Sequence, residues 1–203
     1  DTENNVINFY YTVGSYGYTV NYLEKGTGKV LAESKNATAN YGDSVTETAV
    51  EIKGYILADD NSKTIVIDTE NNVINFYYTV NSYGYTVNYL EEGTNKVLAS
   101  AKTASADFGT TVTETAIAIE GYTVSGESDK ELTIATEGNV INFYYTVNTY
   151  GYTVNYLEED TNIVLVEAKT ATAPYGSSVT ETAVAIDGYT SVNDHSKTIT
   201  IDT

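Results

Sequence analysis

The nine residues NVINFYYTV decide the fold of this chain, and they occur three times, at residues 5–13, 72–80 and 139–147. Apolar side chains alternate in them with a period of two, which is typical of a β-strand. One face of the predicted strand is wholly apolar, and we expect it to meet the core. In the first copy this face consists of Ile7, Phe9, Tyr11 and Val13.

A second segment repeats at the same interval. GYTVNY occurs at residues 17–22, 84–89 and 151–156, so each copy lies 67 residues after the previous one. A fixed period of this length is the signature of tandem modules. Modules of this size lie near the lower limit for one stable core, so we expect neighbours to support each other.

The segment after each NVINFYYTV copy predicts a β-hairpin. Residues 18–23 form a strand that buries Val20 and Tyr22, and Gly26-Thr27-Gly28 supplies a flexible turn. The chain then returns through residues 29–34. This hairpin is expected in all three repeats.

The middle of each repeat carries two competing signals. Residues 44–47, SVTE, have the spacing of a helix capping box. The Thr, Val and Ile residues that follow disfavour a helix, so we expect at most one helical turn before a strand near 50–57. A further strand is predicted at 64–67. Each repeat then has five or six strands.

Composition excludes several classes of function. The chain has 28 acidic and 10 basic side chains, a net charge of −18, and no Cys. This charge repels phosphate backbones and anionic membranes, so we expect no nucleic-acid partner and no membrane insertion. Disulfides and Cys-based zinc sites cannot form.

No set of residues predicts catalysis, so we expect no enzyme and no cofactor. His195 is the single His, it lies in the third repeat, and no nucleophile and base recur together. The acidic turn at Asp59-Asp60-Asn61 and its counterpart Asn193-Asp194 carry oxygen ligands but lack the spacing of a calcium loop. We therefore predict no metal site.

An intramolecular Lys-Asn isopeptide crosslink is a further hypothesis. It requires a Lys, an Asn and a carboxyl group together in an apolar core. Lys35, Asn8 or Asn75, and Glu47 provide these residue types. The competing interpretation is a surface Lys and a strand Asn that faces water.

Tyrosines are the candidate contact residues, since the chain has 20 of them and no Trp. Their rings either stack on sugars or pack neighbouring modules together and stiffen the array. We expect the second role to dominate. The residues concerned are Tyr10, Tyr16, Tyr18, Tyr77, Tyr83, Tyr85, Tyr144, Tyr150 and Tyr152.

These motifs together resemble the MucBP (mucin-binding protein) repeats of Gram-positive bacterial surface proteins. The resemblance lies in YTVNYLE at 18–24, YGDSVT at 41–46, the Gly54-Tyr55 step and the closing NVINFYYT, and it extends over the whole chain. In the second copy, Phe108-Gly109-Thr110 stands where the first has Tyr41-Gly42-Asp43. The resemblance implies a mainly β fold, a tandem array of three small β-grasp-like (ubiquitin-like) modules that form an elongated rod.

The phase of the repeats suggests four segments. Residues 1–16 are expected to be the closing strand of a preceding or partner module plus a linker, 17–80 the first repeat, 81–147 the second, and 148–203 the third without its closing strand. Three explanations fit this phase. The chain is a window on a longer array, its true module is permuted, or its leading strand completes the last core of another molecule by strand addition.

The function expected from these features is a non-enzymatic extracellular stalk or adhesin array on a Gram-positive cell surface or cell wall. The resemblance implies host mucin or other glycans as partners. The alternative is a filament subunit whose partner is a second copy, joined head to tail. A third possibility is an accessory array of a carbohydrate-active enzyme.

Overall fold

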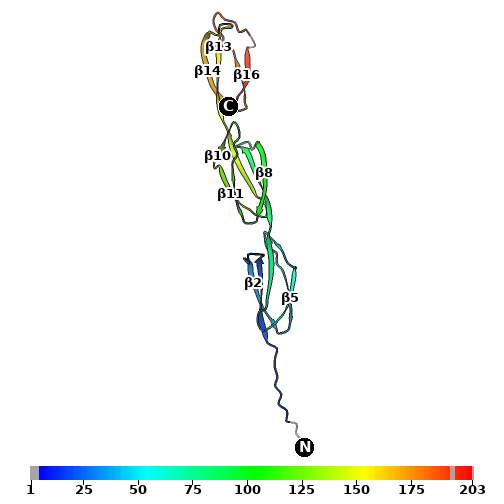
Figure 1. Cartoon of the computed structure of the whole chain (residues 1–203). Helices are drawn as coiled ribbons and strands as arrows, with labels where there is room; N and C mark the ends of the chain where they lie inside the picture. Colours follow the sequence, from blue (N-terminus) through cyan, green and yellow to red (C-terminus); the bar gives the residue numbers. More distant parts are fainter. Residues whose placement is uncertain (1–4, 193–194, 203) are drawn as a thin grey trace. The chain divides into compact units, whose positions relative to one another are not determined.

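A computed structural model describes residues 5–192 and 195–202 of the chain. Its regular structure in those ranges consists of β-strands, with no helix (Figure 1). The strands fall into three repeat-like sets along the chain. This confirms the expectation of a mainly β protein built from three tandem repeats.

The chain divides into two compact units that cut across the sequence repeats. The first unit runs to Gly84 and adds the segments Ser105–Thr110 and Thr133–Gly138. The second consists of Tyr85–Ala104, Thr111–Leu132 and the chain from Asn139 onward. The first unit therefore holds the whole first repeat together with one end of the second.

The first repeat forms one four-stranded sheet and one two-stranded sheet. The larger sheet has the order β2-β1-β6-β4, and the smaller pairs β3 with β5. Strands β1 and β2 form the predicted hairpin, whereas β1 and β6 are parallel. The strands are β1 (Ser15–Glu24), β2 (Val30–Asn40), β3 (Ser44–Thr48), β4 (Tyr55–Leu57), β5 (Ser62–Val66) and β6 (Val73–Val80).

The core lies between the two sheets and is built on the alternation of β1 and β6. Val20 on β1 and Phe76 on β6 have no exposed surface, and Tyr22 stacks on Phe76 with ring centroids 6.2 Å apart. Burying such rings removes the largest apolar surfaces of the repeat from water. The predicted inward faces of both strands are confirmed.

The second repeat has the same arrangement. Its larger sheet has the order β10-β12-β7-β8 with a parallel pair β12 and β7, and its smaller sheet pairs β11 with β9. Val87 and Phe143 are fully buried, as their counterparts in the first repeat are. The strands are β7 (Ser82–Glu91), β8 (Val97–Asp107), β9 (Thr111–Thr115), β10 (Tyr122–Ser125), β11 (Asp129–Thr133) and β12 (Val140–Val147).

The third repeat has a smaller set of strands. The described residues form β13 (Thr149–Leu157), β14 (Val164–Pro174), β15 (Ser178–Thr182) and β16 (Ser196–Thr200). They pair as two two-stranded sheets, β13 with β14 and β15 with β16. Within the described part of the chain no strand occupies the place of β6 or β12 here, so Val154 and Tyr156 stay half-buried.

Two sequence-based expectations differ from the structure in the middle of the repeat. The residues of the capping box, 44–47, lie in strand β3, because Glu47 binds Lys35 and Tyr18 instead of the local backbone. The strand expected at 50–57 is reduced to β4, Tyr55–Leu57. The more specific β-grasp expectation is not confirmed.

The first copy of NVINFYYTV also differs from its expected form. Residues 5–14 form no strand and run as an extended thread before β1 (dark blue in Figure 1). Phe9 is 76% exposed and Tyr10 is 90% exposed. In the other two copies the last eight of these nine residues form β6 and β12, each paired with a neighbouring strand, whereas residues 5–13 have no partner strand in the described structure.

Candidate docking interface between repeats

A glycine of the first repeat and an aromatic ring of the second meet within the first unit. Gly54 is buried and has φ +83°, a left-handed conformation that favours glycine. A Cβ atom on Gly54 would fall inside the ring of Phe108. The absence of a side chain at Gly54 is therefore what admits the ring.

Two further rings and a pair of backbone hydrogen bonds complete this interface. Tyr55 and Tyr83 both meet Phe108 edge to face, with centroids 6.2 and 6.3 Å apart. The Asn81 amide donates to the Gly54 carbonyl at 2.9 Å, and the Phe108 amide donates to the Asn81 carbonyl at 2.9 Å. The residue that links the repeats is thus hydrogen-bonded on both sides.

The second unit contains the same arrangement 67 residues further on. Gly121 receives the ring of Tyr175, which meets Tyr122 and Tyr150 edge to face at 6.2 and 6.3 Å. The Asn148 amide donates to the Gly121 carbonyl, and the Tyr175 amide donates to the Asn148 carbonyl, both at 2.8 Å. We call each such set an aromatic-glycine junction.

Each half of a junction also occurs alone in the described structure. At the start of the first repeat, Tyr41 meets Tyr16 edge to face at 6.3 Å, but its ring is 56% exposed. At the other end, Gly188 has φ +81° and nothing near its Cβ position, and Tyr189 is 50% exposed. These halves have the same form as the corresponding parts of the paired junctions.

The structure places the nine candidate tyrosines in four different environments. The first set, Tyr16, Tyr83 and Tyr150, lies against the junction rings. The second set, Tyr18, Tyr85 and Tyr152, points into the repeats and donates to glutamates. Tyr77 and Tyr144 lie half-exposed beside Lys63 and Lys130, and Tyr10 is exposed.

The tyrosines of the second set belong to a Tyr-Glu-Lys cluster that occurs in each repeat. In the second repeat, Tyr85 donates to Glu114 at 2.7 Å and the Lys102 ammonium binds both carboxylate oxygens at 2.8 and 2.7 Å. The side chain of Glu114 is 9% exposed. A nearly buried carboxylate is thus compensated by one cation and one hydroxyl.

These contacts shift the titration of all three members. The hydrogen bonds from Lys102 and Tyr85 lower the pKa of Glu114 below its ordinary value. The bond to Glu114 raises the pKa of both Tyr85 and Lys102, because deprotonating either donor would remove it. The cluster therefore keeps its charges paired over the neutral pH range.

The acidic turn considered for calcium is engaged within the protein. Asp59 accepts from Lys63 at 2.9 Å and from the Tyr77 amide at 2.8 Å. Among the described residues no group of three His, Cys, Asp or Glu side chains is placed to hold a metal ion. The counterpart Asn193-Asp194 lies outside the described residues.

The residues considered for an isopeptide crosslink are divided between two clusters. Lys35 binds Glu47 at 2.7 and 2.8 Å. The side chain of Asn75 instead accepts from Asn21 at 2.9 Å across the parallel strands. Lys35 and Asn75 therefore each have a different partner.

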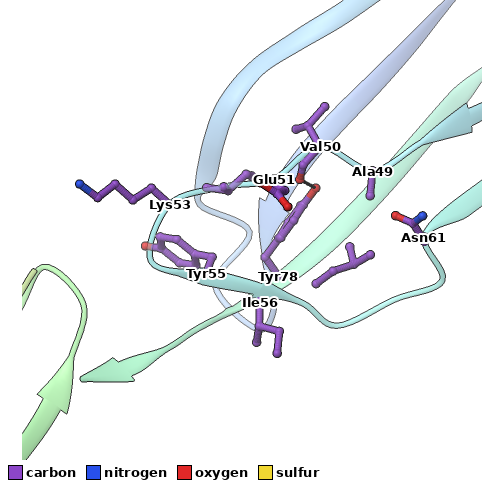
Figure 2. Close-up of a pocket in the computed structure, with 10 residues that line it drawn as sticks. Ala49, Val50, Glu51, Lys53, Tyr55, Ile56, Asn61 and Tyr78 are labelled. Carbon is purple, nitrogen blue, oxygen red and sulfur yellow. Dashed lines mark hydrogen bonds between the residues drawn. The ribbon is translucent and has the colours of Figure 1, made fainter. Parts of the chain in front are cut away.

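A shallow pocket of about 630 Å³ lies in the first repeat, beside the loop before β4. Figure 2 shows the Tyr78 hydroxyl directed at the Val50 carbonyl, to which it donates at 2.8 Å. Tyr55 lines the same pocket. This hydrogen bond fastens the loop that carries Gly54 to the core strand β6, so the loop presents the junction in a fixed form.

The sequence predictions missed the aromatic residue of the junction. Position 41 and its copies hold Tyr41, Phe108 and Tyr175, each followed by Gly. The sequence shows that Phe108 follows Gly54 by the same number of residues as Tyr175 follows Gly121. It did not show that the ring of one repeat meets the glycine of the repeat before it, since this contact spans 54 residues.

Comparison with known proteins identifies the repeats. The family model of the MucBP domain matches residues 19–79, 86–146 and 153–203. Internalin J of Listeria monocytogenes serotype 4b (strain F2365) is 32% identical over 201 residues, which cover 93% of this chain and 22% of the relative. Internalin I of the same strain is 30% identical over 153 residues, covering 73% of this chain and 8% of the relative. The chain thus spans about a fifth or less of these relatives.

The solved structures that this chain matches are more distant in sequence. The Bacillus anthracis TIE protein has a TM-score of 0.49 at 15% identity, covering 94% of this chain and 48% of that chain. The type 2 repeat of the mucus binding protein MUB from Lactobacillus reuteri has a TM-score of 0.27 at 16% identity, covering 65% of this chain and 99% of that chain. Separately, no helix in the described ranges has the length and apolar character needed to cross a bilayer.

Proposed function

Since this chain belongs to the MucBP domain family and carries three of its repeats, we propose that it is a non-enzymatic stalk and adhesin array of a Gram-positive surface protein. Its role is to hold other parts of the protein away from the cell and to present contact surfaces along its length. The match to the MucBP domain family and the relatives named as internalins support an extracellular location and an adhesive role.

The observation that carries this proposal is the repeated aromatic-glycine junction. A flexible tether would leave the linking residue solvated, whereas Asn81 is hydrogen-bonded on both sides and Phe108 is seated on Gly54. Such contacts restrict the swing of one repeat on the next. An array joined in this way transmits force and keeps its end-to-end length, which is what a stalk requires.

Binding of glycans is the second part of the proposal. Tyr77 and Tyr144 are half-exposed on the outer face of β6 and β12, beside Lys63 and Lys130. Aromatic faces of this kind stack on sugar rings. The net charge of −18 repels acidic sugars, so we expect a preference for the neutral sugars of mucin.

Two sets of substitutions separate the mechanical and the adhesive parts. Phe108→Ser with Tyr83→Ser empties one junction, and Tyr77→Ser with Tyr144→Ser removes the outer rings. We expect the first pair to broaden the distances between spin labels in the first and second repeats while binding to neutral mucin oligosaccharides is retained. We expect the second pair to weaken binding and leave the distances unchanged.

The opposite results would overturn the two parts separately. Unchanged label distances in the first pair would remove the mechanical part of the proposal. Unchanged oligosaccharide binding in the second pair would remove the adhesive part. Wild-type protein that binds no neutral oligosaccharide would do the same.

A further inference from the structure

The first and last strands of the first repeat are neighbours in one sheet and run in the same direction. Strand β1 pairs with β6 from Thr19 opposite Val73 to Glu24 opposite Tyr78. In the second repeat, β7 and β12 pair in the same way over the corresponding residues. Because the two strands are parallel, the chain enters this ladder at one end, through the start of β1, and leaves it at the other, through the end of β6.

The connection after each of these ladders is a single residue. Strand β6 ends at Val80 and β7 begins at Ser82, so Asn81 alone lies between them. Asn148 likewise follows β12, which ends at Val147, and precedes β13. A pull along the chain therefore has no flexible linker to extend before it reaches the paired strands.

A pull on the two ends of a repeat acts on this ladder in shear. It draws β1 towards its N-terminal end and β6 towards its C-terminal end, so the strands separate only by sliding along each other. The hydrogen bonds of the ladder all join the two sliding strands and are therefore stretched at the same time. When two strands are instead pulled apart from one end of their ladder, the bonds break one after another, and each carries the force alone.

Backbone hydrogen bonds close both ends of the ladder. In the first repeat the Thr19 amide donates to the Asn72 carbonyl at 2.9 Å, and the Lys25 amide donates to the Tyr78 carbonyl at 2.7 Å. The corresponding two bonds of the second repeat both measure 2.9 Å. The ladder is thus paired up to the points where a pull would enter and leave it.

A buried asparagine just before β6 ties this end of the ladder to β1 a second time. Asn72 is 8% exposed, and its side-chain amide donates to the Gly17 carbonyl at 3.1 Å and to the Asp68 carbonyl at 2.8 Å. Its side-chain oxygen accepts from the Asp68 amide at 2.8 Å. Because a buried amide that loses its partners is costly, these bonds oppose the sliding of β1.

Side chains on both faces of the ladder also join the two strands. On the half-exposed face, the Asn21 side chain donates to that of Asn75 at 2.9 Å. On the inner face, Tyr22 stacks on Phe76 and Val20 is fully buried. Since the side chains of a strand alternate with a period of two, sliding by one residue would break the contacts on both faces together.

We propose that the parallel pair of β1 and β6, and its copy β7 and β12, is a mechanical clamp that makes each of these repeats resist unfolding when the chain is pulled from its ends. Forced unfolding is governed by the unfolding rate, so the clamp acts on the barrier to unfolding. Its use in adhesion rests on the proposed stalk, because only an array under tension needs it. The clamp itself is a property of the single repeat.

The test compares two directions of pull on the first repeat of the whole chain. The chain contains no Cys, so two introduced cysteines alone define where the handles of a force spectrometer are attached. Ser15→Cys with Thr79→Cys places the handles at opposite ends of the ladder. Lys25→Cys with Thr79→Cys places them at the same end. The three substituted residues are exposed, so the core is left intact.

We expect the first repeat to need a several-fold higher unfolding force with the handles at opposite ends than with the handles at the same end. The first direction stretches the bonds of the ladder together, and the second opens them one at a time. The thermal unfolding of the two forms without handles should coincide, which shows that the pulling direction is the only difference. Equal forces in the two directions, or a lower force with the handles at opposite ends, would overturn the proposal.

A second measurement checks that the force passes between β1 and β6. Asn75→Ala removes the side-chain bond to Asn21, which crosses the clamp. Asn36→Ala is the matched control, because it removes the 2.8 Å bond from Thr19, which joins β1 to β2. With the handles at opposite ends and the force held constant, Asn75→Ala should unfold about fivefold faster than its parent, and Asn36→Ala at the rate of the parent. Equal rates for the two variants would contradict the assignment.

These outcomes are separate from those of the proposed function. Label distances across the junction of Phe108 and binding of oligosaccharides test the stalk and the adhesin, and neither depends on how one repeat responds to a pull. Equal forces in the two directions would therefore remove the clamp and leave the stalk standing. Open junctions would remove the stalk and leave the shear resistance of the single repeat unchanged.

Discussion

The ring of Phe108 occupies the space that a side chain on Gly54 would fill, and the two residues come from different repeats. Gly54 contributes both this space and a positive φ, while Phe108 contributes an apolar face and a backbone amide that bonds Asn81. The glycine of one repeat thus admits the aromatic ring of the next. The same relationship joins Gly121 and Tyr175.

Substituting Gly54 should open the first junction. Gly54→Ala meets the left-handed backbone cost of about 1–2 kcal/mol and an overlap with Phe108 worth about 1–3 kcal/mol more. We expect hydrogen exchange at the Asn81 and Phe108 amides to become markedly faster. Gly188→Ala is the matched control, since its φ is +81° but its Cβ meets nothing. Equal destabilisation by both substitutions would show that the ring contact adds no stability.

The NVINFYYTV copies should respond differently to the same substitution. Phe143→Ala removes a fully buried ring and should cost about 3–5 kcal/mol in the free energy of unfolding of the second repeat. Phe9→Ala changes the same position of an exposed copy and should stay within about 0.5 kcal/mol. Site-resolved hydrogen exchange in denaturant measures both. A comparable cost at Phe9 would mean that residues 5–13 are packed within a single molecule.

The Tyr-Glu-Lys cluster should make stability depend on acid. Glu114 has a pKa below the ordinary 4.5, so its contribution is full above pH 4.5 and is lost as pH falls through the folded-state value. Glu114→Gln should therefore lower stability at pH 7 and show a smaller loss on acidification than wild type.

The control for this experiment is Glu33→Gln, which changes the net charge equally at an exposed position of β2. Because acidification also relieves the general repulsion among 28 acidic side chains, the difference between the two variants is the informative quantity. Identical pH profiles for Glu114→Gln and Glu33→Gln would contradict the assignment. Thermal unfolding followed from pH 3 to pH 8 provides the comparison.

The alkaline limb of the same cluster has the opposite sign. Tyr85 and Lys102 have raised pKa values, so their contribution is complete below their ordinary values of 10.0 and 10.5 and disappears as pH rises through the folded-state values. Tyr85→Phe should remove part of this alkaline loss. Titration of tyrosinate absorbance should show one ionisation fewer at the highest pH, and an unchanged high-pH profile would exclude the hydrogen bond to Glu114.

Intact mass should match the uncrosslinked sequence. Lys35 is bound to Glu47, and the side chain of Asn75 is bound to Asn21, so these two residues are each engaged with another partner. A mass lower by the loss of one or more ammonia molecules would contradict this arrangement. The measurement needs denatured, unmodified protein.

Local alternation predicted the strands better than it predicted their partners. The inward face of residues 72–80 and the burial of Val20 and Tyr22 follow from a period of two, a property of neighbouring residues. The capping-box spacing at residues 44–47 predicted a helical turn that does not form. Glu47 instead binds Lys35 and Tyr18, which are remote in sequence. Where the strongest contact is remote, a local pattern gives the wrong element.

The junction shows the same limit at the level of the site. Tyr83 and Tyr150, two of the tyrosines predicted to make contacts, lie at the junctions. The same prediction included Tyr18 and Tyr85, whose rings are buried and bonded to glutamates. Residues two positions apart on one strand point the same way, but the depth of each depends on the partner it meets.

Amide hydrogen exchange at Asn81 and Phe108 tests most directly whether neighbouring repeats are docked. The Asn81 amide donates to the Gly54 carbonyl, and the Phe108 amide donates to the Asn81 carbonyl. We predict protection comparable to that of the amides in β6, lost in Gly54→Ala and kept in Gly188→Ala. Exchange of these two amides at the rate of an unstructured linker in the wild type would contradict the account.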